Sequence, residues 1–129
     1  MDDIKAPRPL AVVTGASSGI GYHLAMIAAQ HGYDLVVAAD RPLDQAVADF
    51  KAAGAEQVRA VQAELASKQG VDDVMAALQG REVDALMANA GHGLAGPFLE
   101  QGFEDIQHVI DTNITGTIYL VQHVARGMV

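Results

Sequence analysis

The chain has 129 residues, of which 50% are hydrophobic and 19% charged, and its formal net charge at pH 7 is −8. This composition is typical of one folded globular domain and unlike that of a disordered chain. The negative charge repels phosphate backbones, so neither nucleic acid nor an anionic membrane is an expected partner. The sequence contains no cysteine, which excludes disulfides and thiolate chemistry.

Nothing in the sequence predicts export or membrane insertion. Residues 1–9 are polar and lack the apolar core of a signal peptide. No apolar run approaches the roughly 20 residues that span a bilayer. We therefore expect a soluble cytoplasmic protein.

Short apolar runs alternate with longer amphipathic stretches along the chain. In chain order we expect a strand at 10–14, a helix at 20–31, a strand at 35–39, a helix at 43–53, a strand at 57–61, a helix at 71–78, a strand at 83–88, and helices at 103–111 and 114–126. Strands that are apolar throughout and separated by helices pair in parallel through right-handed crossovers. The pattern predicts a doubly wound α/β sheet forming a single domain over 1–129.

The junction of the first strand and first helix carries a glycine-rich motif, TGASSGIG, at residues 14–21. Gly15 permits a tight turn, Gly19 lets backbone approach a ligand, and Gly21 allows the helix to pack closely on the strand. The helix N-terminus then offers unpaired N–H groups and a partial positive charge to phosphates.

The context of the motif favours a dinucleotide over a turn that binds nothing. Asp40 follows the second strand and lies 19 residues after Gly21, close to the ~20 expected for a carboxylate that binds an adenosine ribose. No Gly-Lys-Ser/Thr follows the glycines, so a phosphate-loop NTPase is disfavoured.

Three motifs together resemble one family, the short-chain dehydrogenases/reductases. They are the TGxxxGxG pattern at 14–21, Asn89-Ala90-Gly91 after the fourth strand, and Asn113 in TNITG at 112–116. The resemblance covers the entire chain. It implies a Rossmann-type, three-layer α/β/α fold that is incomplete on its C-terminal side, a nicotinamide dinucleotide, and reversible oxidation of a small-molecule alcohol to a carbonyl.

The resemblance also implies site residues. The cofactor-binding set would be Gly15, Ser17, Ser18, Gly19, Ile20, Gly21, Asp40, Arg41, Glu64, Leu65, Asn89, Ala90 and Gly91. Asn89 would brace the sheet, and Asn113 would be the catalytic-site asparagine. Glu64 would lie by the adenine, where the family more often has the shorter Asp; a solvated carboxylate opening the third helix is an equal alternative.

The residues around the ribose favour NAD over NADP. The Asp40 carboxylate would pair with a 2′-hydroxyl and repel a 2′-phosphate, and Ser18 is neutral where many NADP-preferring members are basic. Arg41 could instead clamp a 2′-phosphate. We interpret it as a partner of Asp40 or a solvated turn residue.

The family's serine and Tyr-x-x-x-Lys have no counterpart in this chain. Tyr119 is followed four residues later by His123, and we interpret the two as residues of a packed helix. We therefore predict cofactor binding without turnover.

The alternative is a non-catalytic dinucleotide-binding module or pseudoenzyme fragment. A sugar-nucleotide epimerase of the family's extended branch is a weaker possibility, because that branch usually has Thr-Gly-x-x-Gly-x-x-Gly.

The histidines, four further carboxylates and the C-terminal apolar residues are interpreted as parts of the fold and not of the cofactor site. The five histidines lack metal-ligand spacing, so no metal site is expected. His92 follows Asn-Ala-Gly and is read as a loop residue that could face the cleft. Four carboxylates read as helix caps: Asp72, Asp73, Glu104 and Asp105. The last helix is apolar on more than one face and the fourth strand forms an open edge, so a homo-oligomer is expected.

Overall fold

The computed structural model describes residues 8–129. The expectation that residues 1–9 form no signal peptide concerns a segment of which residues 1–7 lie outside the described range. Four parallel strands form one sheet in the order β3-β2-β1-β4. Their bounds are β1 (Leu10–Thr14), β2 (Asp34–Ala39), β3 (Val58–Gln62) and β4 (Ala85–Met87). The order and the parallel pairing confirm the doubly wound sheet predicted from the sequence.

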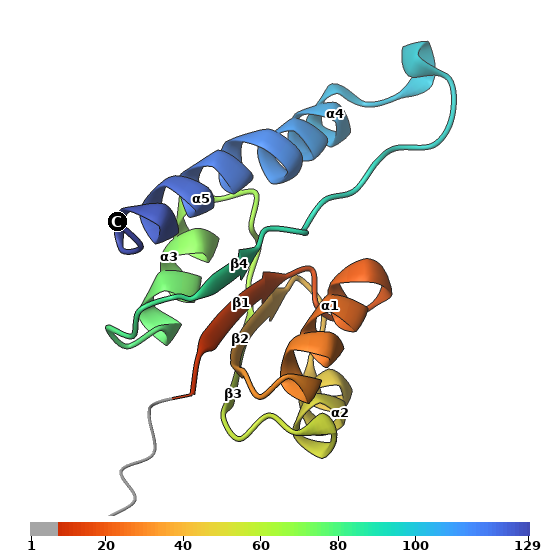
Figure 1. Ribbon diagram of the computed structural model, residues 1–129. Coiled ribbons are helices and arrows are strands. Elements are labelled where there is room, and N and C mark those ends of the chain that lie inside the picture. Colours follow the sequence, from red (N-terminus) through yellow and green to blue (C-terminus); the bar gives the residue numbers. More distant parts are fainter. Residues whose placement is uncertain (1–7) are drawn as a thin grey trace, which may run out of the picture.

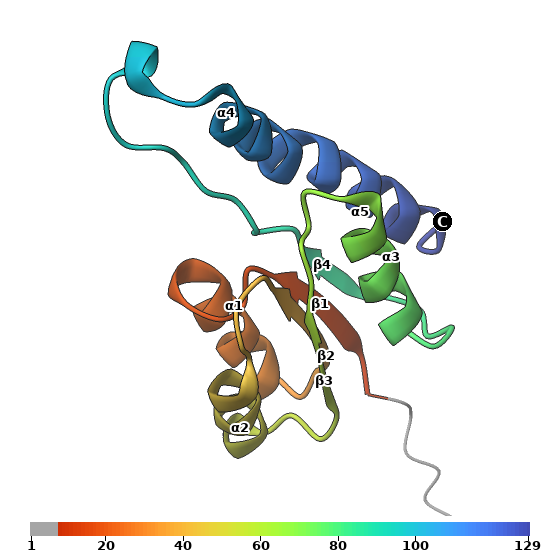
Figure 2. The same cartoon turned by 180° about the vertical axis from the view of Figure 1, so that it is seen from behind.

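Helices cover both faces of the sheet, which gives three layers (Figures 1 and 2). The helices α1 (Gly19–Gln30) and α2 (Asp44–Ala53) pack on one face, and α3 (Lys68–Ala77) and α5 (Gly116–Arg126) on the other. Side chains alternate along each buried strand, so β1 and β2 contribute to a separate apolar core on each face. The Rossmann-type α/β/α architecture is thereby confirmed.

The two edge strands differ from the prediction. All residues of β1 and β2 are buried, whereas β3 is only partly buried and carries Arg59 and Gln62, so the expectation of strands apolar throughout is wrong for β3. The fourth strand is shorter than the predicted 83–88. It begins at Ala85, and just before it the Asp84 carboxylate accepts the N–H of Leu10 while the Asp84 N–H donates to the Leu10 carbonyl.

Of the four carboxylates predicted as helix caps, two lie at the start of a helix and two do not. Ser67 caps α3, with its Oγ accepting the Gly70 N–H at 3.1 Å, so α3 begins at Lys68 and not at 71. Asp72 and Asp73 therefore lie within α3, and their assignment as caps is wrong. Glu104 and Asp105 do lie in the first turn of α4 (Phe103–Ile110), as predicted.

The predicted break between the last two helices is absent. A π-helical segment over Asp111–Thr115 joins α4 to α5, and Figure 1 shows one continuous helical rod. A π turn accommodates an additional residue by widening the helix and not by ending it. A short 3₁₀ turn (Phe98–Glu100) precedes α4. Between residues 8 and 129 no helix combines the length and apolarity needed to cross a bilayer.

Candidate functional site: a cleft at the carboxyl ends of the strands

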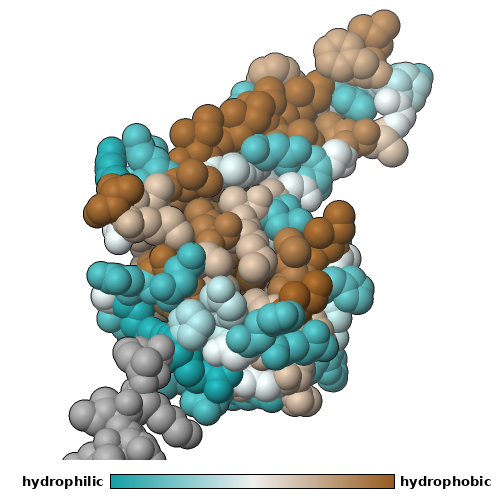
Figure 3. Space-filling view, in the orientation of Figure 1, coloured by the Kyte–Doolittle hydropathy of each residue, from teal (hydrophilic) through white to brown (hydrophobic). Residues whose placement is uncertain are grey.

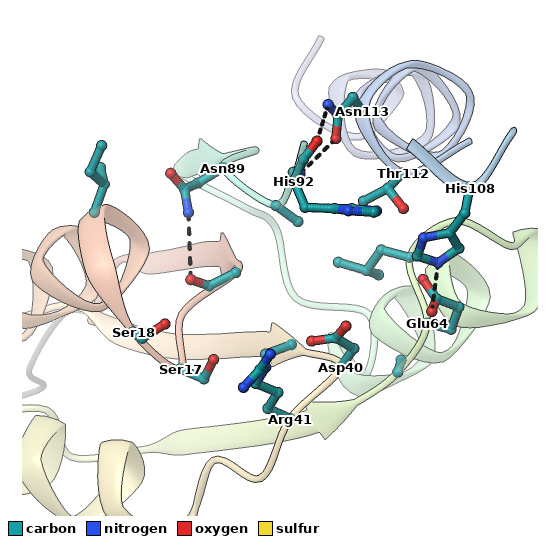
Figure 4. Close-up of a pocket in the computed structure, with 17 residues that line it drawn as sticks. Ser17, Ser18, Asp40, Arg41, Glu64, Asn89, His92, His108, Thr112 and Asn113 are labelled. Atoms are coloured by element: carbon teal, nitrogen blue, oxygen red, sulfur yellow. Dashed lines mark hydrogen bonds and ion pairs between the residues drawn. The ribbon is translucent and has the colours of Figure 1, made fainter. Parts of the chain in front are cut away.

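A cleft of about 790 Å³ lies where the carboxyl ends of the strands meet the α4–α5 rod. Seventeen residues line it, from the segments after all four strands and from the end of α4 and the π segment (Figure 4). The predicted site residues on its wall are Gly15, Ser17, Ser18, Ile20, Asp40, Arg41, Glu64, Leu65, Asn89, Ala90, Gly91 and Asn113. Gly19 and Gly21 lie in the first turn of α1 and do not line the cleft.

The glycine motif adopts a backbone that other residues rarely reach. Gly15 and Gly19 have φ of +68° and +61°, in the left-handed region. A Cβ on Gly21 would collide with the carbonyl oxygen of Gly15 and the amide of Asn89. The three glycines thus bend the chain sharply off β1 and seat α1 directly behind the bend.

The N-terminus of α1 is available to an anion. Ser18 is the N-cap residue, its side chain makes no capping hydrogen bond, and the first turn contains no acidic residue. The first N–H groups of a helix have no acceptor within the helix. Their partial positive charge at this end of the cleft therefore suits a phosphate group.

Thr14 joins the glycine turn to the segment after β4. Its Oγ1 accepts the N–H groups of Asn89 and Ala90, each at 3.0 Å, and the Asn89 side chain donates to the Thr14 carbonyl at 3.2 Å. These bonds fix the two adjacent loops of the cleft relative to each other. Thr14 was not predicted as a site residue, although it is the first residue of the TGASSGIG motif.

Asp40 and Arg41 both line the cleft just beyond β2. Within residues 8–129 no ion pair joins them, so of the two interpretations of Arg41 the structure agrees with the solvated turn residue and not with the partner of Asp40. Both residues are exposed, and Figure 4 shows their side chains at the cleft wall opposite Asn113.

Asn113 fastens the π segment to the loop after β4. Its Oδ1 accepts the N–H of His92 at 2.9 Å, and its Nδ2 donates to the His92 carbonyl at 2.8 Å. This two-way amide contact holds the far wall of the cleft in place.

Glu64 is paired with a residue that the sequence analysis missed. Its Oε2 lies 3.1 Å from Nε2 of His108 on α4, and its Oε1 accepts the Ala66 N–H at 3.1 Å. Burial acts to raise the pKa of Glu64, but the Ala66 N–H and His108 together outweigh it and leave that pKa below its ordinary value. Glu64 is also about half-exposed and lies in the turn that leads into α3, so the alternative of a solvated carboxylate at the start of that helix stands beside the adenine contact. No sequence pattern relates positions 64 and 108.

Tyr119 and His123 contact other side chains away from the cleft. Tyr119 packs its ring 4.1 Å from that of His123 and donates to Asp72 at 3.0 Å, a hydrogen bond that raises the pKa of the phenol. Neither Tyr119 nor His123 lines the cleft. In the part of the chain that the structure describes, no three His, Asp or Glu side chains gather as a metal-binding group.

The parallel sheet, the helices on both faces and the cleft at the carboxyl ends define a Rossmann-type domain. Residues 9–129 match the family model for short chain dehydrogenase. The chain therefore belongs to the short-chain dehydrogenase family, and the resemblance found from its three motifs is confirmed.

Individual relatives agree with this assignment. The chain is 37% identical to human retinol dehydrogenase 8, over 95% of this chain and 40% of that protein. It is 33% identical to L-rhamnose 1-dehydrogenase (NAD(P)(+)) from a Sphingomonas strain, over 92% of this chain and 48% of the other. The chain thus spans about half the length, or less, of these curated relatives.

Solved structures show the same fold. L-sorbose reductase from Gluconobacter frateurii, complexed with NADPH and L-sorbose, matches with a TM-score of 0.86 and 29% identity, over 94% of this chain and 48% of that one. A 3-oxoacyl-[acyl-carrier protein] reductase from Brucella melitensis in complex with NAD matches with a TM-score of 0.83 and 30% identity, over 96% of this chain and 50% of that one.

Proposed function

We propose that the chain is the dinucleotide-binding part of an NAD(P)-dependent oxidoreductase that interconverts a small-molecule alcohol and its carbonyl by hydride transfer. One observation carries the proposal: the cleft is walled by a glycine turn and begins at a helix N-terminus whose side chains leave its N–H groups uncapped. Such a site fits a pyrophosphate without any basic side chain.

The strand order supports one orientation for a bound dinucleotide. The segments on the cleft edge follow the order 63–65, 40–41, 15–18 and 89–92, because the sheet runs β3-β2-β1-β4. With the pyrophosphate at the glycine turn and a ribose at Asp40, the adenine would lie by residues 63–65. The nicotinamide would then lie by residues 89–92 and Asn113.

Asp40 supports NAD over NADP as the cofactor. Its carboxylate would accept hydrogen bonds from a ribose 2′-hydroxyl and repel a 2′-phosphate. Arg41 lies beside it on the same wall and would oppose this preference in part. The two neighbours named above were solved with NADPH and with NAD respectively, so the charge at Asp40 is the feature to test.

A bound dinucleotide would donate the hydride in its reduced form and accept it in its oxidised form, and the residues of this chain would hold and orient it. Asn113 would contribute to the catalytic site by fixing the loop at His92. No lysine follows Tyr22, Tyr33 or Tyr119 by four residues. We expect this chain alone to bind the cofactor without turnover. Robust NADH oxidation by the purified chain with a panel of carbonyl compounds would contradict this.

Calorimetric titration of the purified chain with NAD⁺ and NADP⁺ tests the proposal. Gly19→Val should abolish measurable binding, because a branched side chain would stand at the phosphate site and the positive φ would be strained. Gly80→Val is the matched control: Gly80 also has positive φ, at +77°, and, like Gly19, has nothing within 4 Å of a Cβ. It lies in the turn after α3, off the cleft. Binding that is absent in the native chain, or equal in the two variants, would refute the proposal.

We also propose that the chain forms a homo-oligomer through the α4–α5 rod. Hydrophobic residues gather along this rod, as Figure 3 shows, and the exposed ones are Phe103, Ile110, Ile114, Ile118 and Val121. Leu120 and Val124 are buried against the α3 face, so only one side of α5 is covered. Sedimentation equilibrium should show an oligomer that Ile118→Glu dissociates and that Ile27→Glu, on α1, leaves intact. A native monomer would contradict this.

A further inference from the structure

A hydrogen-bonded contact between Glu64 and His108 connects two separate walls of the cleft. Glu64 belongs to the turn after β3, and His108 projects from α4, 44 residues later. The pair is formed at 3.1 Å, with the two side chains 49% and 42% exposed. Figure 4 shows both side chains at one end of the cleft, with the carboxylate held beneath the imidazole ring.

Stability of the fold is a poor explanation for this pair. Even a fully charged pair of half-exposed side chains contributes little, because solvent screens it and two flexible side chains must be ordered. Each of the two side chains nevertheless makes a further contact that holds it in place. The second carboxylate oxygen accepts the Ala66 N–H, and the His108 ring contacts the ring of His92 with centroids 4.7 Å apart. Asn113 in turn holds the His92 backbone.

Glutamate at this position needs such a restraint if it is to recognise a ligand. Its side chain has one more rotatable bond than aspartate, so an unrestrained carboxylate would sample several positions in the turn. The hydrogen bonds from Ala66 and His108 fix one carboxylate position at the cleft wall. Each carboxylate oxygen can accept more than one hydrogen bond, so both retain capacity for a ligand donor.

We propose that His108 is a positioning residue that holds the Glu64 carboxylate where it reads the exocyclic amine of the adenine base. The inference rests on the proposed function, which places the adenine at residues 63–65. A fixed carboxylate accepts a hydrogen bond from the adenine amine. It repels a base that presents a carbonyl oxygen at the same position, because two acceptors then face each other. Glu64 and His108 together therefore select adenine.

The test compares NAD⁺ with nicotinamide hypoxanthine dinucleotide, in which a carbonyl replaces the adenine amine. Dissociation constants for both are measured by calorimetry on the native chain and on four variants. The native chain should bind NAD⁺ roughly tenfold more tightly than the hypoxanthine analogue, the effect expected for one hydrogen bond to a charged acceptor. Glu64→Gln should remove this preference, because a carboxamide can donate to the carbonyl as well as accept.

His108→Ala should reduce the preference to about twofold or less, while His108→Gln, whose amide can still donate to Glu64, should restore most of it. His123→Ala is the matched control, because His123 also packs on an aromatic ring but lies outside the cleft. It should keep the native ratio. A purely structural role for His108 would weaken both dinucleotides equally and leave the ratio unchanged.

The outcomes separate the two proposals. If NAD⁺ binds and His108→Ala keeps the native preference, His108 does not position Glu64 and the inference is wrong while the proposed function stands. If the native chain binds NAD⁺ and its hypoxanthine analogue equally, the base is not read at Glu64 and the inference is also wrong. If neither dinucleotide binds to the native chain, both proposals fail.

Discussion

The two ends of β2 carry the same residue type in opposite circumstances. At the amino end, Asp34 is buried, with its side chain 7% exposed, and lies 2.9 Å from Arg81 and 3.5 Å from Arg8. It also accepts the Gln57 N–H. At the carboxyl end, Asp40 is exposed on the cleft wall, and among residues 8–129 no charged side chain pairs with it.

This contrast separates a residue that holds the fold from one that is available to a ligand. A buried carboxylate is tolerated only when ion pairs and hydrogen bonds compensate the loss of water, and Asp34 has that compensation. Its partners come from the chain before β1 and from the turns before β3 and β4, so the amino end of the sheet is closed by its own residues. The carboxyl end keeps its polar groups facing the cleft.

The largest expected effect is on stability, from Asp34→Ala. The substitution leaves the partly buried guanidinium of Arg81 without its carboxylate, so the free energy of unfolding should fall by about 3–5 kcal/mol. Urea denaturation followed by circular dichroism measures this change. Glu56→Ala, which removes an exposed partner of Arg8, should lower the same quantity by at most about 1 kcal/mol. Equal losses in the two variants would show that burial at Asp34 has no special weight.

Asp40→Asn should change the choice of cofactor and leave the stability of the fold almost unchanged. Its free energy of unfolding should stay within about 0.5 kcal/mol of the native value, because the side chain has no internal partner to lose. The ratio of NADP⁺ to NAD⁺ affinity should rise by roughly tenfold, since the charge that repels a 2′-phosphate is gone. Calorimetry with both cofactors provides the ratio. Asp44→Asn, which removes an equal charge from the start of α2, should leave the ratio unchanged; the account fails here if both variants shift it equally.

The smallest effect is expected from a hydrogen bond that belongs to neither end of the sheet. The Tyr22 phenol on α1 donates to Asp49 on α2 at 2.6 Å, which raises the pKa of Tyr22 and lowers that of Asp49. The Asp49 contribution to stability is present above its unfolded pKa and is lost as the pH falls through the lower folded value. The Tyr22 contribution is present below pH ~10 and is lost as the pH rises through the higher folded value.

Tyr22→Phe should therefore lower stability at neutral pH and flatten the pH dependence of unfolding at both the acid and the alkaline limits. Chemical denaturation across the pH range measures this. A variant whose profile parallels the native one at every pH would show that the hydrogen bond does not couple the two groups.

The sequence predicts those parts of the molecule that depend on neighbours along the chain. The parallel sheet, the helices that cover it and the glycine turn follow from the TGASSGIG motif and from strands separated by helices. Errors occur where a local signal is ambiguous. Thr112 and Asn113 resemble a helix break, yet the helix continues through a π segment. Asp72 resembles a cap only because Ser67, the actual cap, lies outside the apolar run.

Contacts between distant residues could not be predicted in this way. His108 meets Glu64 only because α4 lies over the turn after β3, and Arg81 meets Asp34 only because two turns converge at the amino end of the sheet. Neither pair has a characteristic spacing. Most of the site residues that the motifs predicted line the cleft. His108, which we propose orients Glu64, was not among the predicted residues.

The most direct measurement is an amide-shift titration of the ¹⁵N-labelled chain with NAD⁺. The account predicts large shifts at the turns that follow the strands, at Gly15, Asp40, Glu64 and Ala90, and none at Asp34 at the opposite end of the sheet. Shifts confined to the amino end, or no shifts at saturating NAD⁺, would contradict the claim that this cleft binds a dinucleotide.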